Sequence, residues 1–185
     1  MKKLLLFVFA TLLFWQLIHA YNTLVTQQEQ VEKSWAQVES MIQRKIDLLP
    51  NLVSVVQKYT SHEKELLTTI TALRSKAQQT LKNATPTKAM QLNKTLQNSL
   101  TQLFFSVENY PQLASNEQFL ELQAQIEGSE NRINVARINY NDAVGNFNAN
   151  LQKFPYFLVA KLMGLQPKPY FQATKEAHKP YHIKI

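Results

Sequence analysis

The side chains best suited to metal or acid–base chemistry are few and poorly spaced. A di-iron helical bundle needs Glu-x-x-His pairs on two helices, and the sequence contains no such pair. His62 and Glu65 stand in the reverse order. His178 and His182 are four residues apart, but Pro180 between them disfavours the helix that a zinc pair at this spacing needs. The chain has no cysteine, so thiolate sites and cysteine nucleophiles are excluded. The sequence therefore predicts no metal, no cofactor and no enzymatic activity.

Charged and amide side chains beside apolar helix positions are the remaining candidates for a site. With the proline that some of them flank, they are Arg44, Asp47, Pro50, Asn51, His62, Glu63, Arg74, Glu130, Asn131, Arg137 and Asn141. Asp47 and Asn51 share a helix face and could bond backbone groups that Pro50 leaves unpaired. Arg137 could pair with a carboxylate on the first helix. We expect interhelical ion pairs that fix helix register; the alternative is a polar groove for a partner protein. On the first interpretation, Asp47→Ala destabilises the fold more than it affects binding.

These side chains depend on helices, which the apolar spacing predicts for most of the chain. From Leu24 to Leu81, apolar residues recur at alternating steps of three and four, the pattern of a long amphipathic helix. Pro50 interrupts this pattern, and a proline kinks or ends a helix. The apolar phase continues across Pro50, which favours a kink. The lengths of the later helices favour a turn instead, because four segments would match better in an up-and-down bundle.

Two later helices have recognisable ends. Thr85-Pro86 predicts the start of one that stops before Tyr110-Pro111. Residues 115–118 form a predicted capping box for the last long helix, which Pro155 ends. We therefore predict an all-α, elongated antiparallel helical bundle behind an N-terminal transmembrane or signal helix. It has three long helices with a kink at Pro50, or four if Pro50 is a turn.

Glycines are scarce and two of them lie inside the last long helix. Three glycines in 185 residues argue against an all-β fold and against a phosphate-binding loop. Gly128 and Gly145 each cost roughly 1 kcal/mol of helix stability relative to alanine. Close contact with a neighbouring helix would explain why both are there.

The chain opens with two lysines and an apolar stretch. Lys2 and Lys3 precede residues 4–20, 17 residues in which only His19 is ionisable. As a helix this stretch spans about 25 Å, slightly less than the roughly 30 Å hydrocarbon core of a bilayer. The side chains expected in the lipid are Leu4, Phe7, Phe9, Leu12, Phe14, Trp15 and Leu17.

This segment has two interpretations. As an uncleaved anchor, which we prefer, it is helped to reach the interface by Trp15 and Tyr21. As a signal peptide, it is cleaved after Ala20. In both cases the lysines come first and no basic residue follows before Lys33. The positive-inside rule then places the N-terminus in the cytoplasm and the body outside.

The C-terminal residues 155–185 are apolar, aromatic and basic. A short helix is predicted over residues 156–165, closed by Gly164. We expect the segment to pack across the bundle; the alternative is a membrane-surface or partner-binding element. Its candidate interface residues are Phe157, Lys161, Lys168, Tyr170 and Phe171. The chain thus divides into an anchor or signal (1–20), a bundle (21–154) and this segment (155–185).

The net charge of +7 is concentrated at the two ends of the chain. Residues 1–20 carry +2, residues 21–153 carry +1 and residues 154–185 carry +4. The nearly neutral body offers no basic helix face, so nucleic acid is not expected as a partner. An electrostatic partner, whether lipid or protein, is expected at the tail.

Several motifs resemble those of the LemA family of bacterial envelope proteins. Residues 44–53, RKIDLLPNLV, carry the strongest resemblance, to the family's Arg-Arg-x-Asp-Leu-x-Pro-Asn-Leu motif, with Lys45 in place of the second arginine. Residues 110–113, YPQL, resemble its Tyr-Pro-Asp-Leu motif with Gln112 for the acid. Residues 21–25, 130–148 and 160–164 extend the match over nearly the whole chain.

The resemblance implies an all-helical bundle behind a membrane anchor and does not imply an activity. We therefore expect a non-enzymatic scaffold or protein–protein interaction bundle. It would be a single-pass protein of the bacterial inner membrane, with its bundle on the periplasmic side. Its expected partners are the membrane and envelope proteins, and a homo-oligomer is compatible with the sequence. The alternatives are a soluble periplasmic or secreted bundle released by cleavage, and a membrane-remodelling protein that acts through its basic tail.

Overall fold

A computed structural model describes residues 1–59, 64–82 and 84–171 of the chain. All regular secondary structure in this part is helical, which confirms the all-α prediction. The helices are α1 (Lys2–Tyr59), α2 (Lys64–Leu81), α3 (Pro86–Val107), α4 (Pro111–Ala114), α5 (Glu117–Asn150) and α6 (Tyr156–Leu162).

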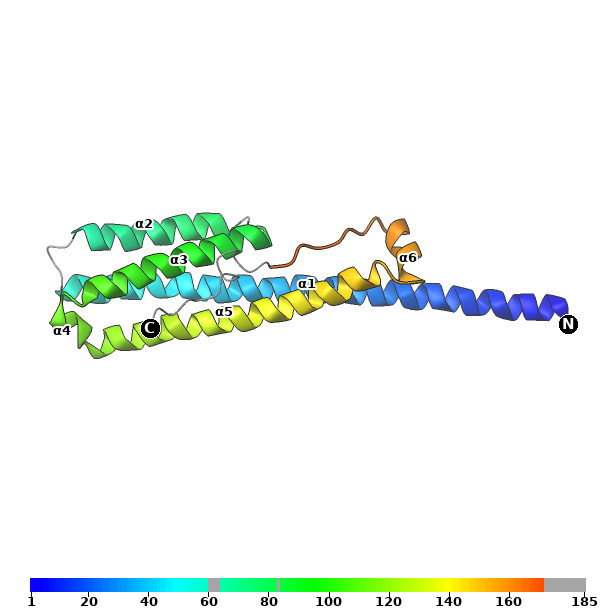
Figure 1. Ribbon diagram of the computed structural model, residues 1–185, viewed down its shortest axis with the longest axis horizontal. Coiled ribbons are helices and arrows are strands. Elements are labelled where there is room, and N and C mark those ends of the chain that lie inside the picture. Colours follow the sequence, from blue (N-terminus) through cyan, green and yellow to red (C-terminus); the bar gives the residue numbers. More distant parts are fainter. Residues whose placement is uncertain (60–63, 83, 172–185) are drawn as a thin grey trace, which may run out of the picture.

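The long helices run alternately up and down the molecule (Figure 1). α5 packs along α1, α2 packs on both α1 and α3, and the short α4 joins α3 to α5 at the end far from the N-terminus. α6 packs on α1 at the opposite end of the bundle, where α1 leaves it and continues alone to the N-terminus. The molecule is therefore an elongated bundle extended by one single helix.

Pro50 does not reverse the chain. α1 continues through Pro50 to Tyr59, so of the two alternatives at that proline the turn is wrong. α1 ends at Tyr59 and α2 begins at Lys64, so the apolar stretch from Leu24 to Leu81 forms two helices and not the single long helix predicted. The bundle nevertheless has four long helices, α1, α2, α3 and α5, as the comparison of helix lengths favoured. Since Leu49 and Leu52 on either side of Pro50 are both fully buried, the apolar phase is kept across it.

The core follows the predicted apolar stripes. On α1 the buried side chains include Leu24, Val31, Val38, Ile42, Ile46 and Leu49. On α5 they include Phe119, Ile126, Ile133, Tyr140, Val144 and Phe147. Burying one such side chain stabilises the fold by about 1.5–3 kcal/mol. These two stripes face each other, which explains why α1 and α5 form the main interface of the bundle.

The helix ends agree with the sequence in one case and differ by one residue in another. Thr85 caps α3 as predicted, its Oγ1 accepting the Lys88 N–H at 3.4 Å. The cap of α5 is Asn116, whose Oδ1 accepts the Phe119 N–H at 3.0 Å, so the predicted capping box at Ser115 is wrong. Ser115 instead donates to the Pro111 carbonyl and closes α4.

The two glycines of α5 are not explained by close helix packing. A Cβ placed on Gly128 would meet no atom within 4 Å, so the expectation of close contact is wrong there. At Gly145 the nearest atom is the Tyr170 hydroxyl at 3.8 Å, an ordinary van der Waals distance. Tyr170 belongs to the C-terminal segment, not to a helix.

Among the described residues, one helix is long and apolar enough to cross a membrane: the N-terminal part of α1. Every residue from Met1 to His19 is exposed. α1 contacts the rest of the bundle only from Ala20 onward. A signal sequence would have the same length and apolar composition as the segment before it. Within the part of the chain that the structure describes, residues 2–19 are therefore an apolar helix with no neighbouring segment.

Candidate functional site

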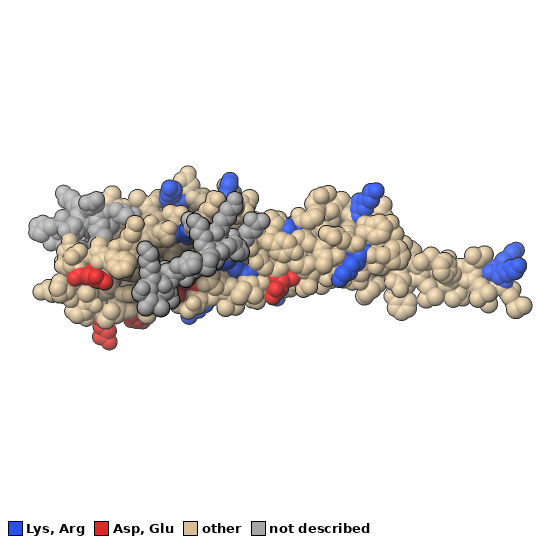
Figure 2. Space-filling view, viewed as in Figure 1, with Lys and Arg blue, Asp and Glu red and all other residues tan. Residues whose placement is uncertain are grey.

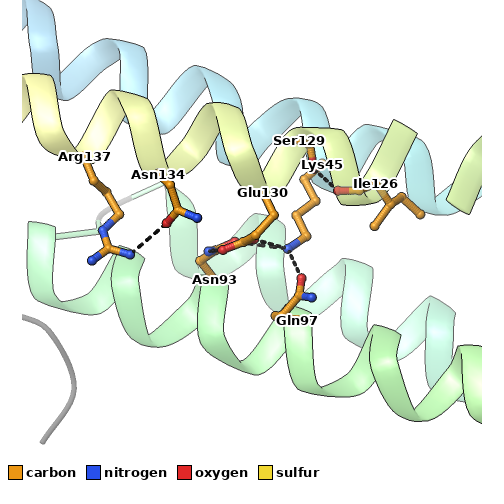
Figure 3. A network of polar contacts seen from close by, with 8 residues as sticks. All are labelled: Lys45, Asn93, Gln97, Ile126, Ser129, Glu130, Asn134 and Arg137. Atoms are coloured by element: carbon orange, nitrogen blue, oxygen red, sulfur yellow. Dashed lines mark hydrogen bonds and ion pairs between the residues drawn. The ribbon is translucent and has the colours of Figure 1, made fainter. Parts of the chain in front are cut away.

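The most buried polar group of the bundle is the ammonium group of Lys45. This side chain has no exposed surface, and its Nζ donates three hydrogen bonds. The acceptors are Glu130 Oε2 at 2.8 Å, Gln97 Oε1 at 2.9 Å and Asn93 Oδ1 at 3.3 Å. Asn93 also donates to both carboxylate oxygens of Glu130, at 3.1 and 3.2 Å. Figure 3 shows Lys45 of α1 reaching between side chains of α3 and α5. We call these four residues the Lys45 cluster.

The Lys45 cluster is arranged for stability and not for reactivity. An ammonium group has three N–H donors, and all three are used here. A nucleophilic or basic lysine needs a free lone pair on Nζ, whereas the Nζ of Lys45 is enclosed by three hydrogen-bond acceptors. Breaking such a pair on one side costs about 3–5 kcal/mol. The cluster therefore fixes the relative register of α1, α3 and α5.

A second polar arrangement holds the C-terminal segment on the bundle. After α6, residues 165–171 run back along α5 without helical structure (Figure 1); we call them the strap. Asn148 accepts the Lys168 N–H at 2.8 Å and donates to the Lys168 carbonyl at 2.9 Å. Asn141 makes the same pair with Phe171, at 2.8 and 3.1 Å.

The spacing of the two asparagines matches the strap. Seven residues of helix span about 10.5 Å, and three residues of extended chain span about 10 Å. Because each asparagine bonds only backbone atoms, these bonds depend on the conformation of the strap and not on its side chains. Lys168 adds an ion pair to Glu32 of α1 at 2.8 Å.

Aromatic packing holds the end of the strap. Phe171 is buried between Trp35 and Tyr140, with ring centroids 5.7 and 5.1 Å away. The Arg137 guanidinium lies over the Phe171 ring, 5.9 Å from its centroid. The Tyr140 hydroxyl donates to the Pro169 carbonyl at 3.0 Å. The strap thereby joins α1 to α5.

Burial shifts the pKa of two groups near these clusters. Desolvation raises the pKa of Tyr140, and the negative charge of Glu32 raises it further. Tyr140 therefore keeps its proton and remains a hydrogen-bond donor. Desolvation also raises the pKa of Glu39, while a hydrogen bond from the Trp35 side chain partly opposes this shift.

The predicted polar residues divide between these clusters and the surface. Glu130 belongs to the Lys45 cluster, while Arg137 and Asn141 contact Phe171 of the strap. The exposed members are Arg44, Asp47, Asn51, Arg74 and Asn131, and Pro50 is half-buried. His62 and Glu63 lie outside the described residues.

Two expected roles of these residues differ in the structure. Asp47 accepts a hydrogen bond from Gln43 at 2.7 Å on the surface, so its exposure removes the reason to expect Asp47→Ala to be strongly destabilising. Arg137 donates to Asn134 of its own helix at 3.2 Å and not to a carboxylate of α1. The interhelical ion pair of the core is formed by Lys45 instead.

Several residues of these clusters were absent from the predicted set, among them Lys45, Asn93, Gln97 and Asn148. Lys45, Asn93 and Asn148 occupy apolar helix faces, and all three are buried. A polar residue on such a face is the sequence signal that could have identified them. Their partners are distant in the sequence, on other helices or in the strap, and leave no local pattern.

The end of the bundle far from the N-terminus carries an open groove between α3 and α5. Its volume is about 350 Å³, and Phe104, Phe105 and Phe119 supply its apolar surface. Phe104 and Phe119 stack edge to face with centroids 6.0 Å apart, whereas Phe105 is largely exposed. Glu108 and Glu127 are the charged residues of its lining. We call this the distal groove.

Fold and clusters together define a class of protein: an antiparallel helical bundle with an exposed apolar N-terminal helix and a buried, hydrogen-bonded polar cluster in its core. Within the described part of the chain, no group of three His, Cys, Asp or Glu side chains could hold a metal ion. The particular family follows from comparison with known proteins. The LemA family model matches residues 34–184, and the chain belongs to the LemA family.

Individual relatives agree with this assignment. Two magnetosome proteins of Paramagnetospirillum magneticum, MamQ 1 and MamQ 2, are each 25% identical to the chain over 187 residues. These alignments cover 89% of the chain and 69% of each relative. Protein LemA of Metamycoplasma hominis is 25% identical over 154 residues, covering 83% of the chain and 69% of the relative.

Proposed function

We propose that this protein is a non-enzymatic, membrane-anchored scaffold whose bundle binds another protein. The observation that carries the proposal is the apolar helix of residues 2–19, which is exposed throughout and continues without a break into the bundle. A helix of 18 residues spans about 27 Å, close to the thickness of the hydrocarbon core. A rigid connection of this kind holds a bundle at a set distance from a membrane.

Retention of the anchor is favoured over cleavage by the surroundings of Ala20. Proteolysis concentrates at exposed loops and loose termini. Ala20, the last residue before the predicted cleavage point, lies within α1 and is buried together with Val159 and Ala160 of α6. The N-terminal lysines support a cytoplasmic N-terminus and an extracytoplasmic bundle.

The distal groove is the surface we propose for the partner. Apolar grooves between two helices commonly receive an amphipathic helix, and the acidic groups at its edge favour basic side chains on that helix. The Lys45 cluster does not serve this purpose because its donors and acceptors are already bonded to each other.

Membrane topology is tested with single cysteines, which the chain otherwise lacks. Lys3→Cys and Gln125→Cys are introduced separately into the full-length protein. Cells whose inner membrane is intact are then treated with a membrane-impermeant maleimide. We expect labelling at position 125 and protection at position 3. Labelling of position 3 with protection of position 125 would reverse the proposed orientation.

Partner binding is tested by a photo-crosslinking amino acid placed at Phe105 in full-length protein in cells. Ile138 of α5 is the matched control, because it is exposed to a similar degree and lies outside the groove. We expect a protein adduct from position 105 that is absent from position 138. Adducts of equal yield at both positions contradict a role for the groove. An adduct with a second copy of this chain would identify the groove as a self-association surface.

A further inference from the structure

The end of the bundle nearest the apolar helix carries an unusual concentration of exposed apolar side chains. Three of them, Phe157, Leu158 and Leu162, belong to α6, and the fourth, Phe154, lies two residues before this helix begins. Their exposed fractions are 73%, 42%, 41% and 87%. Four large apolar side chains within nine residues are more than scattered surface hydrophobics, which need no explanation. We call these four residues the juxtamembrane patch.

The packing of α6 on α1 explains where this helix lies, but it does not explain why the side chains of the juxtamembrane patch are apolar and exposed. α6 is held on α1 by Val159 and Ala160, which pack on Ala20 and Leu24. If α6 merely covered the end of the core, its remaining apolar side chains would be directed inward or replaced by polar ones. The patch residues instead lie outside this contact and face away from the bundle core.

The distance along α1 places the patch at the level of a bilayer surface. From Lys2 to Ala20 the helix rises about 27 Å, slightly short of the roughly 30 Å hydrocarbon core. α6 packs within the next turn beyond this point. Trp15 and Tyr21, which are both exposed, lie on α1 before and after Ala20, and aromatic residues are enriched at membrane interfaces in this way.

The charges around the patch fit anionic lipid. Lys153 and Lys161 are exposed beside it, and the sequence has no acidic residue between Asp142 and Glu176. Figure 2 shows basic groups at the tip of the N-terminal helix, then an uncharged length, then basic groups again where α6 joins the bundle. Lysines beside apolar side chains are the usual composition of a helix lying in the headgroup region.

We propose that α6 is a second membrane contact, inserting the juxtamembrane patch into the lipid interface beside the anchor. The packing of Val159 and Ala160 on Ala20 and Leu24, and the strap that follows α6, hold this helix in place, so insertion requires no rearrangement. The bundle is then held to the membrane at two points, which restricts its rotation about the anchor and fixes the direction in which the distal groove points. This inference rests on the proposed anchoring function.

Single-cysteine spin labels test the inference in the full-length chain, which has no native cysteine. Leu162→Cys and Phe154→Cys are compared with Ile138→Cys, an exposed apolar position on α5 away from the patch, and with Leu12→Cys in the anchor. Each labelled protein is reconstituted into vesicles of equal parts phosphatidylcholine and phosphatidylglycerol. Collision rates of the label are then measured with oxygen, which concentrates in lipid, and with a water-soluble nickel chelate.

We expect the labels at positions 154 and 162 to favour oxygen several-fold over the nickel chelate, as the label at 12 does, and the label at 138 to favour nickel. Labels at 154 and 162 that behave like the one at 138, while 12 remains in lipid, overturn the inference but leave the anchor intact. A label at 12 that is accessible to nickel contradicts the proposed function itself. Labels at 154 and 162 shielded from both reagents would show that a protein surface covers the patch, which also overturns the lipid contact.

Discussion

The Nζ of Lys45 lies 2.8 Å from Glu130 Oε2, although the two residues are 85 positions apart in the chain and belong to different helices. Lys45 is completely buried, while the Glu130 side chain keeps 25% of its surface exposed. Asn93 and Gln97 of α3 complete the set of partners. Three helices are therefore held in one register by a single ammonium group.

Removing one side of this pair is expected to be costly. Glu130→Leu leaves the buried Lys45 charge without its counter-ion, so the free energy of unfolding should fall by about 3–5 kcal/mol. The double variant Lys45→Met/Glu130→Leu removes both charges and should recover much of this loss. Thermal unfolding followed by circular dichroism in detergent measures both variants, with Asp47→Ala as a surface control expected within about 0.5 kcal/mol of the native protein.

Equal losses in the single and double variants would contradict the ion pair as the source of stability. A loss larger for Asp47→Ala than for Glu130→Leu would restore importance to the surface carboxylate of the motif.

The pH dependence of stability should include a contribution from Glu39. Because burial raises its folded-state pKa above the ordinary 4.5, the folded protein binds this proton more tightly than the unfolded chain. The contribution of protonated Glu39 to the stability of the fold is thus fully present below the pKa of the unfolded chain. It is lost as the pH rises through the raised pKa of the folded protein. Glu39→Gln is neutral at all pH values and keeps an acceptor for Trp35. It should melt higher than the native protein at pH 7 and should lose this advantage below about pH 4. An advantage that grows on acidification would contradict the direction of the shift.

Two glycines should respond to alanine with opposite signs. Gly128 is helical with open space around its Cα, so Gly128→Ala should raise the free energy of unfolding by about 1 kcal/mol. Gly164 closes α6 at a φ of +67°, where a Cβ is strained, so Gly164→Ala should lower it by about 1 kcal/mol. Chemical denaturation of both variants measures the difference. A stabilising effect at Gly164 would contradict the left-handed geometry at the end of α6.

Asn148 should control the attachment of the strap. Asn148→Ala removes both bonds to the Lys168 backbone, so the Lys168 amide should exchange with solvent many times faster. Asn146 is exposed on the same helix and serves as the matched control in Asn146→Ala. Hydrogen–deuterium exchange of the strap peptide measures both. Unchanged exchange in Asn148→Ala would show that the aromatic packing of Phe171 alone holds the strap.

The sequence predicts those features that depend on local spacing. Steps of three and four located the buried faces of α1 and α5, and a threonine before a proline located the start of α3. The end of α1 at Tyr59 escaped prediction because the apolar phase runs past it toward Ile70, which is also buried. A turn was considered at Pro50 because proline often ends a helix, but its half-buried ring is accommodated within α1.

The clusters were harder to predict because their partners are distant in sequence. A lysine on an apolar face such as Lys45 is ordinarily expected to extend to solvent along its aliphatic stem. Its burial is stable only because Asn93, Gln97 and Glu130 converge from two other helices. The asparagines that hold the strap pair with backbone atoms, which carry no sequence signal.

Sequencing the N-terminus of the protein purified from cell membranes tests the central claim, retention of the apolar helix as an anchor, most directly. We predict that the protein recovered from the membrane fraction begins at Met1 or Lys2 and resists extraction by high salt and carbonate. A mature chain that begins at Tyr21 and is recovered in the soluble fraction would contradict both the anchor and the membrane contact of α6.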